Sequence, residues 1–566
     1  MSITSALRLL LQLPGIRHLR SFRARYRRLS ILLAAAAVAL GIGIGVYAYF
    51  TSHGTANASA SVGSLSAPII TDGTPGAGTV DLTWSAITPP VADTVTYSVS
   101  RNGGDAAGNC PTASSPTTVL TCTDTGLTAG TYHYTVTAHW RTWTAPSGTQ
   151  DVTVASGPVD HYKLQASTTT PTAGSGDNLT ITAQDASNHT VTAYTGDKSL
   201  TFTGAGTIGS FHPTVTDKNG AAVNFGTAET VTFSSGVATV SSGSNGVMTM
   251  YKAESPTITV SDGTTSGTLN VTVSAASAAS LTLAAATTTP TAGQGDNLTI
   301  TAKDTYGNTA TSYSGDKGLT FAGASTIGSF HPTVTDKNGS AVNFGTSTTI
   351  TFSSGVASVS SGANGVMTLY KAEGPTITVG DGSISNSGLP VTVGAASAAS
   401  LTLAAATTTP TAGVGNNLTV TAKDAYGNTA TSYTSTQNLT FGGAGNAPDG
   451  THPTVTNSSG TAINFGSSTA ITFSSGVATV SSSSNGVMKL FKAESPSITV
   501  TDGSISNSGL LVTVSPGTAA SLLLQAASTT PTAGTADNLT ITAKDTWQNT
   551  ATGYTGDHGL TFSGAS

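Results

Sequence analysis

Two cysteines are the residues of this chain most suited to covalent chemistry. Cys110 and Cys122 are the only cysteines among 566 residues. In a protein outside the cytoplasm such a pair forms a disulfide more often than a metal or catalytic site. Two free buried thiols are the alternative. We therefore predict a Cys110–Cys122 disulfide, which would stabilise its domain by roughly 3 kcal/mol in the chain-entropy model.

Three histidines and one glycine-rich string are the other candidates for a site. His212, His331 and His452 each precede a proline at equivalent places in a repeated pattern, with no second recurrent His or Cys nearby. A zinc site needs three or four converging ligands, so we predict exposed histidines. Gly204–Gly209 matches a dinucleotide-binding string, which cradles phosphate only when a helix follows directly. A hairpin is expected there instead, so the match is interpreted as accidental.

Lys252 and Glu254 recur in two later copies of the pattern, and their spacing places both on one face of a strand. One interpretation is an exposed ion pair worth less than about 1 kcal/mol. The alternative is a covalent Lys–Asn cross-link like that of Gram-positive pilus-type sandwiches, with Asn224 as a recurrent partner. The sequence has no Gly-x-Ser-x-Gly, His-Glu-x-x-His or calcium-loop signature. We predict no catalytic, metal or cofactor-binding residue, no cofactor, and a protein that is not an enzyme.

A long internal repeat determines where these residues lie in the fold. Thr-Thr-Thr-Pro-Thr-Ala-Gly stands at 168–174, 287–293 and 407–413, and with one change at 528–534, so the marker prolines lie 119, 120 and 121 residues apart. A period near 120 is about the size of a whole domain and too long for a solenoid unit. The repeat therefore predicts a string of similar domains.

Charge is scarce and unevenly placed. Only 8% of residues are charged, against roughly 25% in an average soluble protein. Residues 1–50 hold seven Arg and no acid, which leaves 14 basic and 27 acidic residues elsewhere, a net formal charge of −13. The basic stretch 1–28 precedes an uncharged apolar stretch at 29–50. That order predicts a cytoplasmic segment followed by a membrane helix, because 22 residues can cross a core of about 30 Å.

Two interpretations of 29–50 remain open. Its length favours a retained signal anchor, since a signal-peptide core usually spans about 7–15 residues. A long cleaved signal is the alternative, because Ala56-Asn57-Ala58 and Ala58-Ser59-Ala60 have cleavage-type spacing. The stretch 48–51 followed by 58–63 also resembles export segments of camelysin-like bacterial surface proteins, which are typically cleaved. Both interpretations place the rest of the chain outside the cytoplasm. A retained anchor would hold these domains at the cell membrane, and a cleaved signal would leave the protein secreted or at the cell surface.

The region 65–155 does not share the repeat. Short alternating runs and the Asn102-Gly103 turn predict a hairpin-rich β-sandwich. Leu82-Thr83-Trp84 and the stretch 127–136 resemble the core-tryptophan and leucine–glycine–tyrosine strands of a fibronectin type III module. The resemblance implies a sandwich and no chemistry. Trp140 and Trp143 could form a sugar-stacking strip, but one buried and one exposed ring is the expected arrangement.

Each long repeat is predicted to be a sandwich of about eight strands. Leu298, Ile300 and Ala302 alternate with threonines, so their side chains are expected to point inward. The turns Lys303–Asn308 and Lys423–Asn428 resemble those of bacterial immunoglobulin-like domains in invasin- and intimin-type surface proteins. That resemblance spans roughly 160–566 and implies a surface stalk or adhesin architecture. The predicted fold class is all-β, with tandem immunoglobulin-like and fibronectin-like sandwiches behind one N-terminal helix.

The domain boundaries follow from these patterns. We predict a basic cytoplasmic segment 1–28, a signal anchor or signal core 29–50, a linker 51–64, a fibronectin type III-like domain 65–155, and immunoglobulin-like repeats at 160–274, 279–394, 399–514 and 520–566. The fourth repeat matches its predecessors only in its first part. It is expected to form an open half-sandwich with Leu539, Ile541 and Phe562 against water, in a fragment of a longer reading frame.

The sequence favours a non-enzymatic bacterial cell-surface stalk or adhesin-like protein. Its expected partners are the membrane through 29–50 and a cell-wall glycan or surface protein, with no nucleic acid. One alternative is the accessory region of a secreted or anchored polysaccharide-degrading enzyme whose catalytic domain lies beyond residue 566. Another is an array of carbohydrate-binding modules. Fold analogy cannot choose among them, because similar sandwiches occur in all three.

Overall fold

The protein is built from β-strands. The computed structural model describes residues 63–564, and every regular element within that range is a strand, which confirms the predicted all-β fold. Segments 1–28 and 29–50, and nearly all of the linker 51–64, lie outside the described residues. Across residues 63–564 the structure contains no helix with the length and apolar character to span a membrane.

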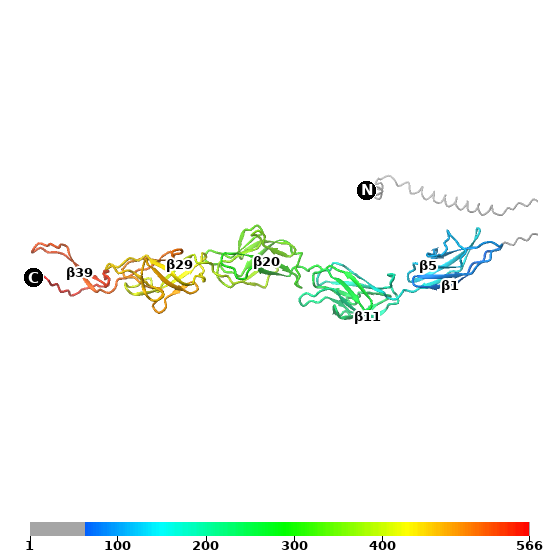
Figure 1. The fold of residues 1–566 in the computed structure, drawn as a ribbon, viewed down its shortest axis with the longest axis horizontal. Coiled ribbons are helices and arrows are strands. Elements are labelled where there is room, and N and C mark those ends of the chain that lie inside the picture. The colour runs from blue at the N-terminus through cyan, green and yellow to red at the C-terminus, as the bar shows by residue number, and fades with distance from the viewer. Residues whose placement is uncertain (1–62, 565–566) are drawn as a thin grey trace, which may run out of the picture.

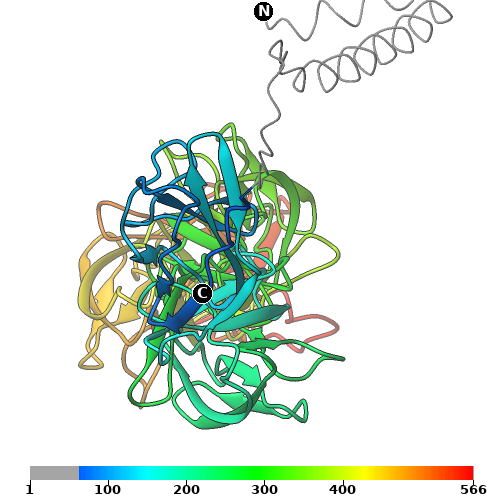
Figure 2. The same cartoon turned by 90° about the vertical axis from the view of Figure 1, so that its right-hand side faces the viewer.

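The strands form successive groups that follow one another in a single row (Figure 1). We name them the amino-terminal domain (β1–β8), repeat 1 (β9–β18), repeat 2 (β19–β28), repeat 3 (β29–β38) and repeat 4 (β39–β40). Figure 2 looks along the row, so that the groups overlap in projection. The contact between one group and the next is therefore made by the ends of the groups.

The amino-terminal domain has two antiparallel sheets, one of order β1-β2-β5 and one of order β4-β3-β6-β7 with β8 on β6. Its strands are β1 Ile70–Pro75, β2 Thr79–Trp84, β3 Thr96–Arg101, β4 Gly104–Asp105, β5 Thr121–Thr125, β6 Gly130–Trp140, β7 Trp143–Pro146 and β8 Gln150–Val154. The predicted Asn102-Gly103 turn joins β3 to β4, with φ of 52° and 85°. Cys110 and Cys122 are joined by a disulfide with their Cα atoms 4.8 Å apart.

Repeats 1 to 3 share one topology. In repeat 1, one sheet has the order β13-β12-β16-β10-β15 with β9 on β10, and the other has the order β14-β11-β17-β18. Its strands are β9 His161–Ala166, β10 Gly176–Gln184, β11 Gly196–Thr203, β12 Thr214–Thr216, β13 Ala222–Asn224, β14 Ala228–Phe233, β15 Val237–Thr239, β16 Val247–Thr249, β17 Thr257–Ser261 and β18 Ser266–Asn270.

Repeats 2 and 3 repeat this order strand by strand. The strands of repeat 2 are β19 Ser280–Ala285, β20 Gly295–Lys303, β21 Gly315–Ala322, β22 Thr333–Thr335, β23 Ala341–Asn343, β24 Ser347–Phe352, β25 Val356–Ser358, β26 Val366–Thr368, β27 Thr376–Gly380 and β28 Leu389–Pro390. Those of repeat 3 are β29 Ser400–Ala405, β30 Gly415–Lys423, β31 Ser435–Gly442, β32 Thr454–Thr456, β33 Ala462–Asn464, β34 Ser468–Phe473, β35 Val477–Thr479, β36 Val487–Lys489, β37 Ser497–Thr501 and β38 Leu510–Leu511.

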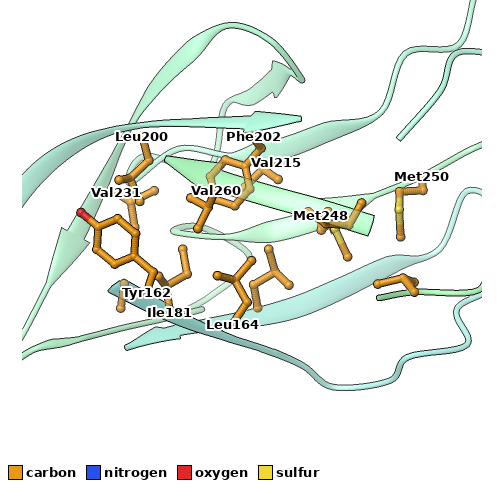
Figure 3. Close-up of a cluster of buried hydrophobic side chains, with 14 of the residues drawn as sticks. Tyr162, Leu164, Ile181, Leu200, Phe202, Val215, Val231, Met248, Met250 and Val260 are labelled. Carbon is orange, nitrogen blue, oxygen red and sulfur yellow. The ribbon is translucent and has the colours of Figure 1, made fainter. Parts of the chain in front are cut away.

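Repeats 1 to 3 thus have ten strands each where about eight were expected. The additional hairpin, β22–β23 in repeat 2, has strands of three residues, which are too short to show a clear alternation. The core lies between the two sheets. Figure 3 shows it in repeat 1, where Ile181 of β10 points toward Leu200 and Phe202 of β11. The predicted inward residues Leu298, Ile300 and Ala302 of repeat 2 are all buried.

Repeat 4 has two described strands, β39 Ser521–Ala526 and β40 Leu539–Lys544, which pair with each other. The apolar side chains of this sheet lie against water. Leu539, Ile541 and Phe562 are 49%, 37% and 59% exposed, as the sequence predicts. The turn after β40 is nevertheless formed as in the complete repeats, because Asp545 accepts hydrogen bonds from the backbone N–H groups of Trp547 and Asn549.

A buried carboxyl distinguishes repeat 2 from repeat 3. Asp296 is 3% exposed, and its Oδ2 has no hydrogen-bond partner. Burial raises its pKa above the ordinary value. The equivalent Asn416 of repeat 3 uses its amide to donate to the carbonyl oxygen of Thr407 at 2.8 Å.

We expect Asp296→Asn to stabilise repeat 2 by about 1 kcal/mol at pH 7, because the amide gains this hydrogen bond and removes an unpaired buried oxygen. Amide hydrogen exchange in the core strands of repeat 2, measured in the full chain with repeat 1 as the internal reference, would report the change. The reciprocal variant Asn416→Asp should destabilise repeat 3 by a similar amount. Equal exchange in both variants and the native chain would contradict the prediction.

Candidate functional site: the joints between repeats

The same small set of residues recurs wherever one repeat meets the next. We call the contacts joint 1 (amino-terminal domain to repeat 1), joint 2 (repeats 1 and 2), joint 3 (repeats 2 and 3) and joint 4 (repeats 3 and 4). In joints 2 to 4 the turn that follows the second strand of one repeat contacts the end of the preceding repeat. This is the turn that the sequence singled out as Lys303–Asn308 and Lys423–Asn428.

A buried asparagine side chain bridges the two repeats at joint 2. The amide of Asn308 donates to the carbonyl oxygen of Tyr251 at 2.7 Å, and its oxygen accepts from the N–H of Ala253, also at 2.7 Å. Asn308 is 5% exposed. Pairing the side-chain amide with a backbone N–H and C=O reproduces one rung of a β-ladder across the boundary.

The asparagine repeats its bridge in the other two joints. At joint 3 Asn428 donates to Tyr370 O at 2.7 Å and accepts from Ala372 N at 2.7 Å. At joint 4 Asn549 donates to Phe491 O at 2.7 Å and accepts from Ala493 N at 2.9 Å. Three joints therefore share one hydrogen-bond geometry.

A buried aspartate holds each bridging asparagine in place. Asp304 accepts from the amide of Asn308 at 2.9 Å and from the backbone N–H groups of Tyr306 and Asn308. Its Oδ2 also accepts from the N–H of Ala276, in the segment that connects the repeats. One carboxylate thus fixes the turn, the bridging side chain and the connector, and bonds to a charged acceptor are the stronger kind.

The hydrogen bonds to the equivalent carboxyl at joint 4, that of Asp545, lower its pKa. Burial alone would raise the pKa of Asp545, but the bonds from the Asn549 amide and from backbone N–H groups outweigh it, so its pKa lies below the ordinary value. The carboxylate therefore stays ionised at neutral pH and keeps its acceptor role.

An aromatic ring from each repeat packs against the core of the repeat before it. Tyr306 of repeat 2 lies 5.0 Å from the ring of Phe211 and 5.1 Å from that of Tyr251, both in repeat 1. Joint 3 has the same trio in Tyr426, Phe330 and Tyr370. Tyr306 and Tyr426 are partly buried and pack against the core clusters of the preceding repeats. Repeats 2 and 3 therefore each extend the apolar packing of their predecessor.

Joint 4 makes an equivalent aromatic contact with different residues. Repeat 3 has Thr451 where repeats 1 and 2 have Phe211 and Phe330, so one ring of the trio is missing. Trp547 stands where the other joints have tyrosine, and its ring centroid lies 5.6 Å from that of Phe491. A larger ring on one side thus accompanies a smaller residue on the other.

In repeats 1 to 3 that ring packs over the last glycine of the repeated Thr-Pro-Thr-Ala-Gly motif, which is Gly174, Gly293 or Gly413. A Cβ on Gly293 would overlap the ring and hydroxyl of Tyr426, and one on Gly413 would overlap Trp547. Gly534 of repeat 4 has the same left-handed backbone, with φ of 82° against 78° for Gly293, but nothing lies within 4 Å of its Cβ position. The repeated Thr-Pro-Thr-Ala-Gly motif therefore serves the joint as well as its own repeat.

We expect Gly293→Ala to open joint 3, because the new methyl group must displace the Tyr426 ring. The readout is hydrogen exchange of the Ala372 amide, which the Asn428 side chain protects. Exchange should become about tenfold to hundredfold faster, equivalent to roughly 1–3 kcal/mol of overpacking.

Two controls isolate the contact from backbone strain. The Ala253 amide at joint 2 should keep its native exchange rate in the same molecule. Gly293→Ala in a Tyr426→Ala background carries the same positive-φ strain without a ring to displace, so it should leave the Ala372 amide at the exchange rate of Tyr426→Ala alone. An Ala372 amide that Gly293→Ala accelerates equally with and without the Tyr426 ring would show that Gly293 is not the seat of the ring.

The structure does not gather the candidate histidines, cysteines and glycine-rich string from the sequence into one site. His212, His331 and His452 are exposed, and residues 63–564 contain no group of three potential metal ligands. The segment after Gly204–Gly209 leads to strand β12 and not to a helix. Cys110 and Cys122 lie in the amino-terminal domain, away from the joints.

Lys252 and Glu254 form the expected ion pair, with Nζ and Oε2 2.7 Å apart. Lys252 is 44% exposed, which does not fit a buried covalent cross-link. The pair flanks Ala253, whose N–H binds Asn308, and Glu254 also accepts from the N–H of Gly206. The ion pair therefore belongs to the acceptor side of joint 2.

The residues that make the joints were not predicted as a site. The signal was present, since an aromatic residue and an asparagine recur at fixed places in the turn and a tyrosine or phenylalanine precedes each Lys-Ala-Glu. Hydrogen-bonded partners lie 55 to 58 residues apart in the sequence and in different repeats, so a reading of one repeat at a time does not bring them together.

Comparison with known proteins adds solved structures of similar β-domain arrays. The adhesin FdeC of Escherichia coli is 20% identical over 58% of this chain and 96% of its own, with a TM-score of 0.27. Invasin, a bacterial integrin-binding protein, is 13% identical over 82% of this chain and 80% of its own, with a TM-score of 0.29. Domains 1–6 of the surface layer protein SbsC are 16% identical over 86% of this chain and 58% of their own, with a TM-score of 0.19. No protein-family model and no curated protein sequence matches the chain.

Proposed function

We propose that this chain is a non-enzymatic stalk or adhesin-like protein of the bacterial cell surface. In this proposal, repeats 1 to 4 are immunoglobulin-like domains of the invasin and intimin type, and the amino-terminal domain is a fibronectin type III-like module. The segment 29–50 holds the chain in the membrane or directs its export. A cell-wall glycan or a surface protein is the expected ligand.

The observation that supports this function most is the recurrence of one joint three times in succession. A chain that needed only tethered domains could use flexible connectors. Here each of joints 2 to 4 has a bridging asparagine, a carboxylate that orders the connector, and an aromatic ring packed against the neighbouring core. Such boundaries hold successive domains end to end, which gives reach. The Cys110–Cys122 disulfide agrees with a place outside the cytoplasm.

Removing one whole repeat tests the stalk. Deleting residues 279–398 joins Ala278 to Ala399, which restores the Ala-Ala-Ser-Leu sequence of the boundary and seats Tyr426 where Tyr306 was. We expect small-angle X-ray scattering to show a molecule shorter by the length of one repeat, with unchanged cross-section. On intact cells, an epitope in repeat 3 should be accessible to antibody in both proteins.

Three outcomes would count against the proposal. An unchanged maximum dimension would mean that the repeats fold back on one another. An epitope accessible only after cell lysis would exclude the surface. Release of sugar from cell-wall polysaccharide by the purified native protein would favour an enzyme over a stalk.

A further inference from the structure

We propose that joint 1 is a pivot, at which the row of repeats changes direction relative to the amino-terminal domain. The inference concerns joint 1 and does not depend on what the protein binds. It comes from comparing the turn of repeat 1 with the three turns that form joints 2 to 4.

The turn of repeat 1 lacks both side chains that make the other joints. Aligned on the shared aspartate, Ser187 stands where Tyr306 stands in repeat 2, and His189 stands where Asn308 stands. Asp185 keeps its local role, because its Oδ1 accepts from the N–H groups of Ser187 and His189. The turn therefore has the same shape but neither the ring nor the amide.

A cleft occupies the place where the missing ring would lie. Ser187 and His189 line a cavity of about 220 Å³ together with Gly78, Leu127 and Ala129 of the amino-terminal domain. In joints 2 to 4 the aromatic ring at the Ser187 position packs against the preceding core. The amino-terminal domain and repeat 1 are thus left with a gap at their boundary, so a small rotation meets little steric resistance.

Few polar contacts hold joint 1. Within residues 63–564 no hydrogen bond or ion pair joins strands β1–β8 to repeat 1 itself. The one bond from the repeat 1 turn to the connector is from the N–H of Gly157 to Asp185 Oδ2, at 3.2 Å. Joint 2 keeps its equivalent of that bond and adds the two bonds of Asn308.

The two kinds of joint therefore differ in what a rotation must break. At joint 2 a rotation breaks two buried hydrogen bonds and withdraws a ring from an apolar seat, and each loss is unfavourable. At joint 1 it breaks neither. Motion between rigid groups concentrates at the boundary with the fewest contacts, so the repeats should move as one rod about the amino-terminal domain.

Distance distributions between spin labels test the pivot in the full chain. Gln150, Thr203 and Ala322 are exposed strand residues of the amino-terminal domain, repeat 1 and repeat 2. After replacement by Cys and labelling with the native disulfide intact, the pair at 150 and 203 spans joint 1, and the pair at 203 and 322 spans joint 2. We expect a distribution at least twofold broader across joint 1. Equal widths would overturn the proposal.

Exchanging the two residues between the joints tests their role. Tyr306→Ser with Asn308→His gives joint 2 the residues of joint 1 and should broaden its distribution to match. Ser187→Tyr with His189→Asn fills the cleft and should narrow the distribution across joint 1. Amide exchange in β10 and β20 should stay native in both variants, which shows that the repeats remain folded. Unchanged widths in both exchanged variants would overturn the assignment of the pivot to these positions.

Discussion

Asp124→Ala is expected to destabilise the amino-terminal domain by about 3 kcal/mol, because it leaves the buried Tyr134 hydroxyl and two partly buried donors without a partner. The Asp124 side chain is fully buried and accepts from the Arg101 guanidinium at 3.0 Å, the Tyr134 hydroxyl at 2.7 Å and the Ala107 N–H at 2.7 Å. Burial, together with this bond to Asp124, raises the pKa of Tyr134 above its ordinary value. The phenol therefore stays protonated as a donor, and it would lose its acceptor.

Tryptophan fluorescence during urea unfolding measures this change in the full chain. Three of the four tryptophans, Trp84, Trp140 and Trp143, lie in the amino-terminal domain, so the signal reports mainly on it. Asp151→Ala is the matched control, since Asp151 pairs with His133 at an exposed site of the same domain. An exposed pair contributes less than about 1 kcal/mol. A loss for Asp124→Ala as small as for Asp151→Ala would show that the buried carboxylate is dispensable.

Local patterns were sufficient to predict the strands and turns. Alternation of apolar residues with threonine placed Leu298 and Ile300 inside, because strand side chains alternate between faces whatever the rest of the chain does. The turn at Asp304 follows equally from local bonding of its carboxylate to N–H groups two and four residues ahead. Gln548 occupies the glycine place of this turn in repeat 4 with φ of 66°, so the turn shape survives without glycine.

The exposure of the two tryptophans was predicted correctly, but the structural reason for it differs from the one expected. One buried and one exposed ring was expected from opposite faces of one strand. Trp140 and Trp143 are 6% and 38% exposed, but they face each other across the turn between β6 and β7, with ring centroids 5.9 Å apart. Arg141 in that turn has φ of 55°, a conformation uncommon for arginine, which the sequence pattern does not signal.

The joints could not be predicted by the same means, because they depend on how one repeat ends against the next. The sequence around Gly293 indicates only an ordinary turn glycine, and the Tyr426 ring that packs against it comes from the next repeat. Likewise, the turn explains Asp304 without any reference to Asn308 and Tyr251. Contacts between domains depend on how the two domains are placed at their boundary, and neither hydrophobic periodicity nor turn chemistry predicts that placement.

Repeat 1 also contains a buried acid, on the same inward face of its strand as Val231 and Phe233. Glu229 of β14 is 5% exposed, and neither of its carboxyl oxygens has a hydrogen-bond partner. Repeats 2 and 3 have Thr348 and Thr469 at this place, and each hydroxyl donates to a backbone carbonyl two residues earlier. Burial, assisted by the nearby charge of Asp217, raises the pKa of Glu229 to about 8.

The raised pKa makes the stability of repeat 1 depend on pH. Below the unfolded-state pKa of about 4.5 both states are protonated, so Glu229 adds no pH dependence. Between about 4.5 and 8 the folded state must keep a proton that the unfolded state releases, so stability falls as pH rises, by up to about 1.4 kcal/mol per unit. Above about pH 8 both states are ionised and the loss levels off.

Glu229→Thr is therefore expected to stabilise repeat 1 by about 3 kcal/mol at pH 7 and by much less at pH 4.5. Hydrogen exchange in β11 and β14, referenced to β21 and β24 of repeat 2 in the same molecule, gives the difference at each pH. Glu229→Gln separates the causes, because it cannot ionise yet remains a buried polar group. It should abolish the pH dependence while gaining less stability at pH 7 than threonine. If the native chain showed the same exchange ratio between repeats 1 and 2 from pH 5 to 8, Glu229 would have to be ionised at an ordinary pKa.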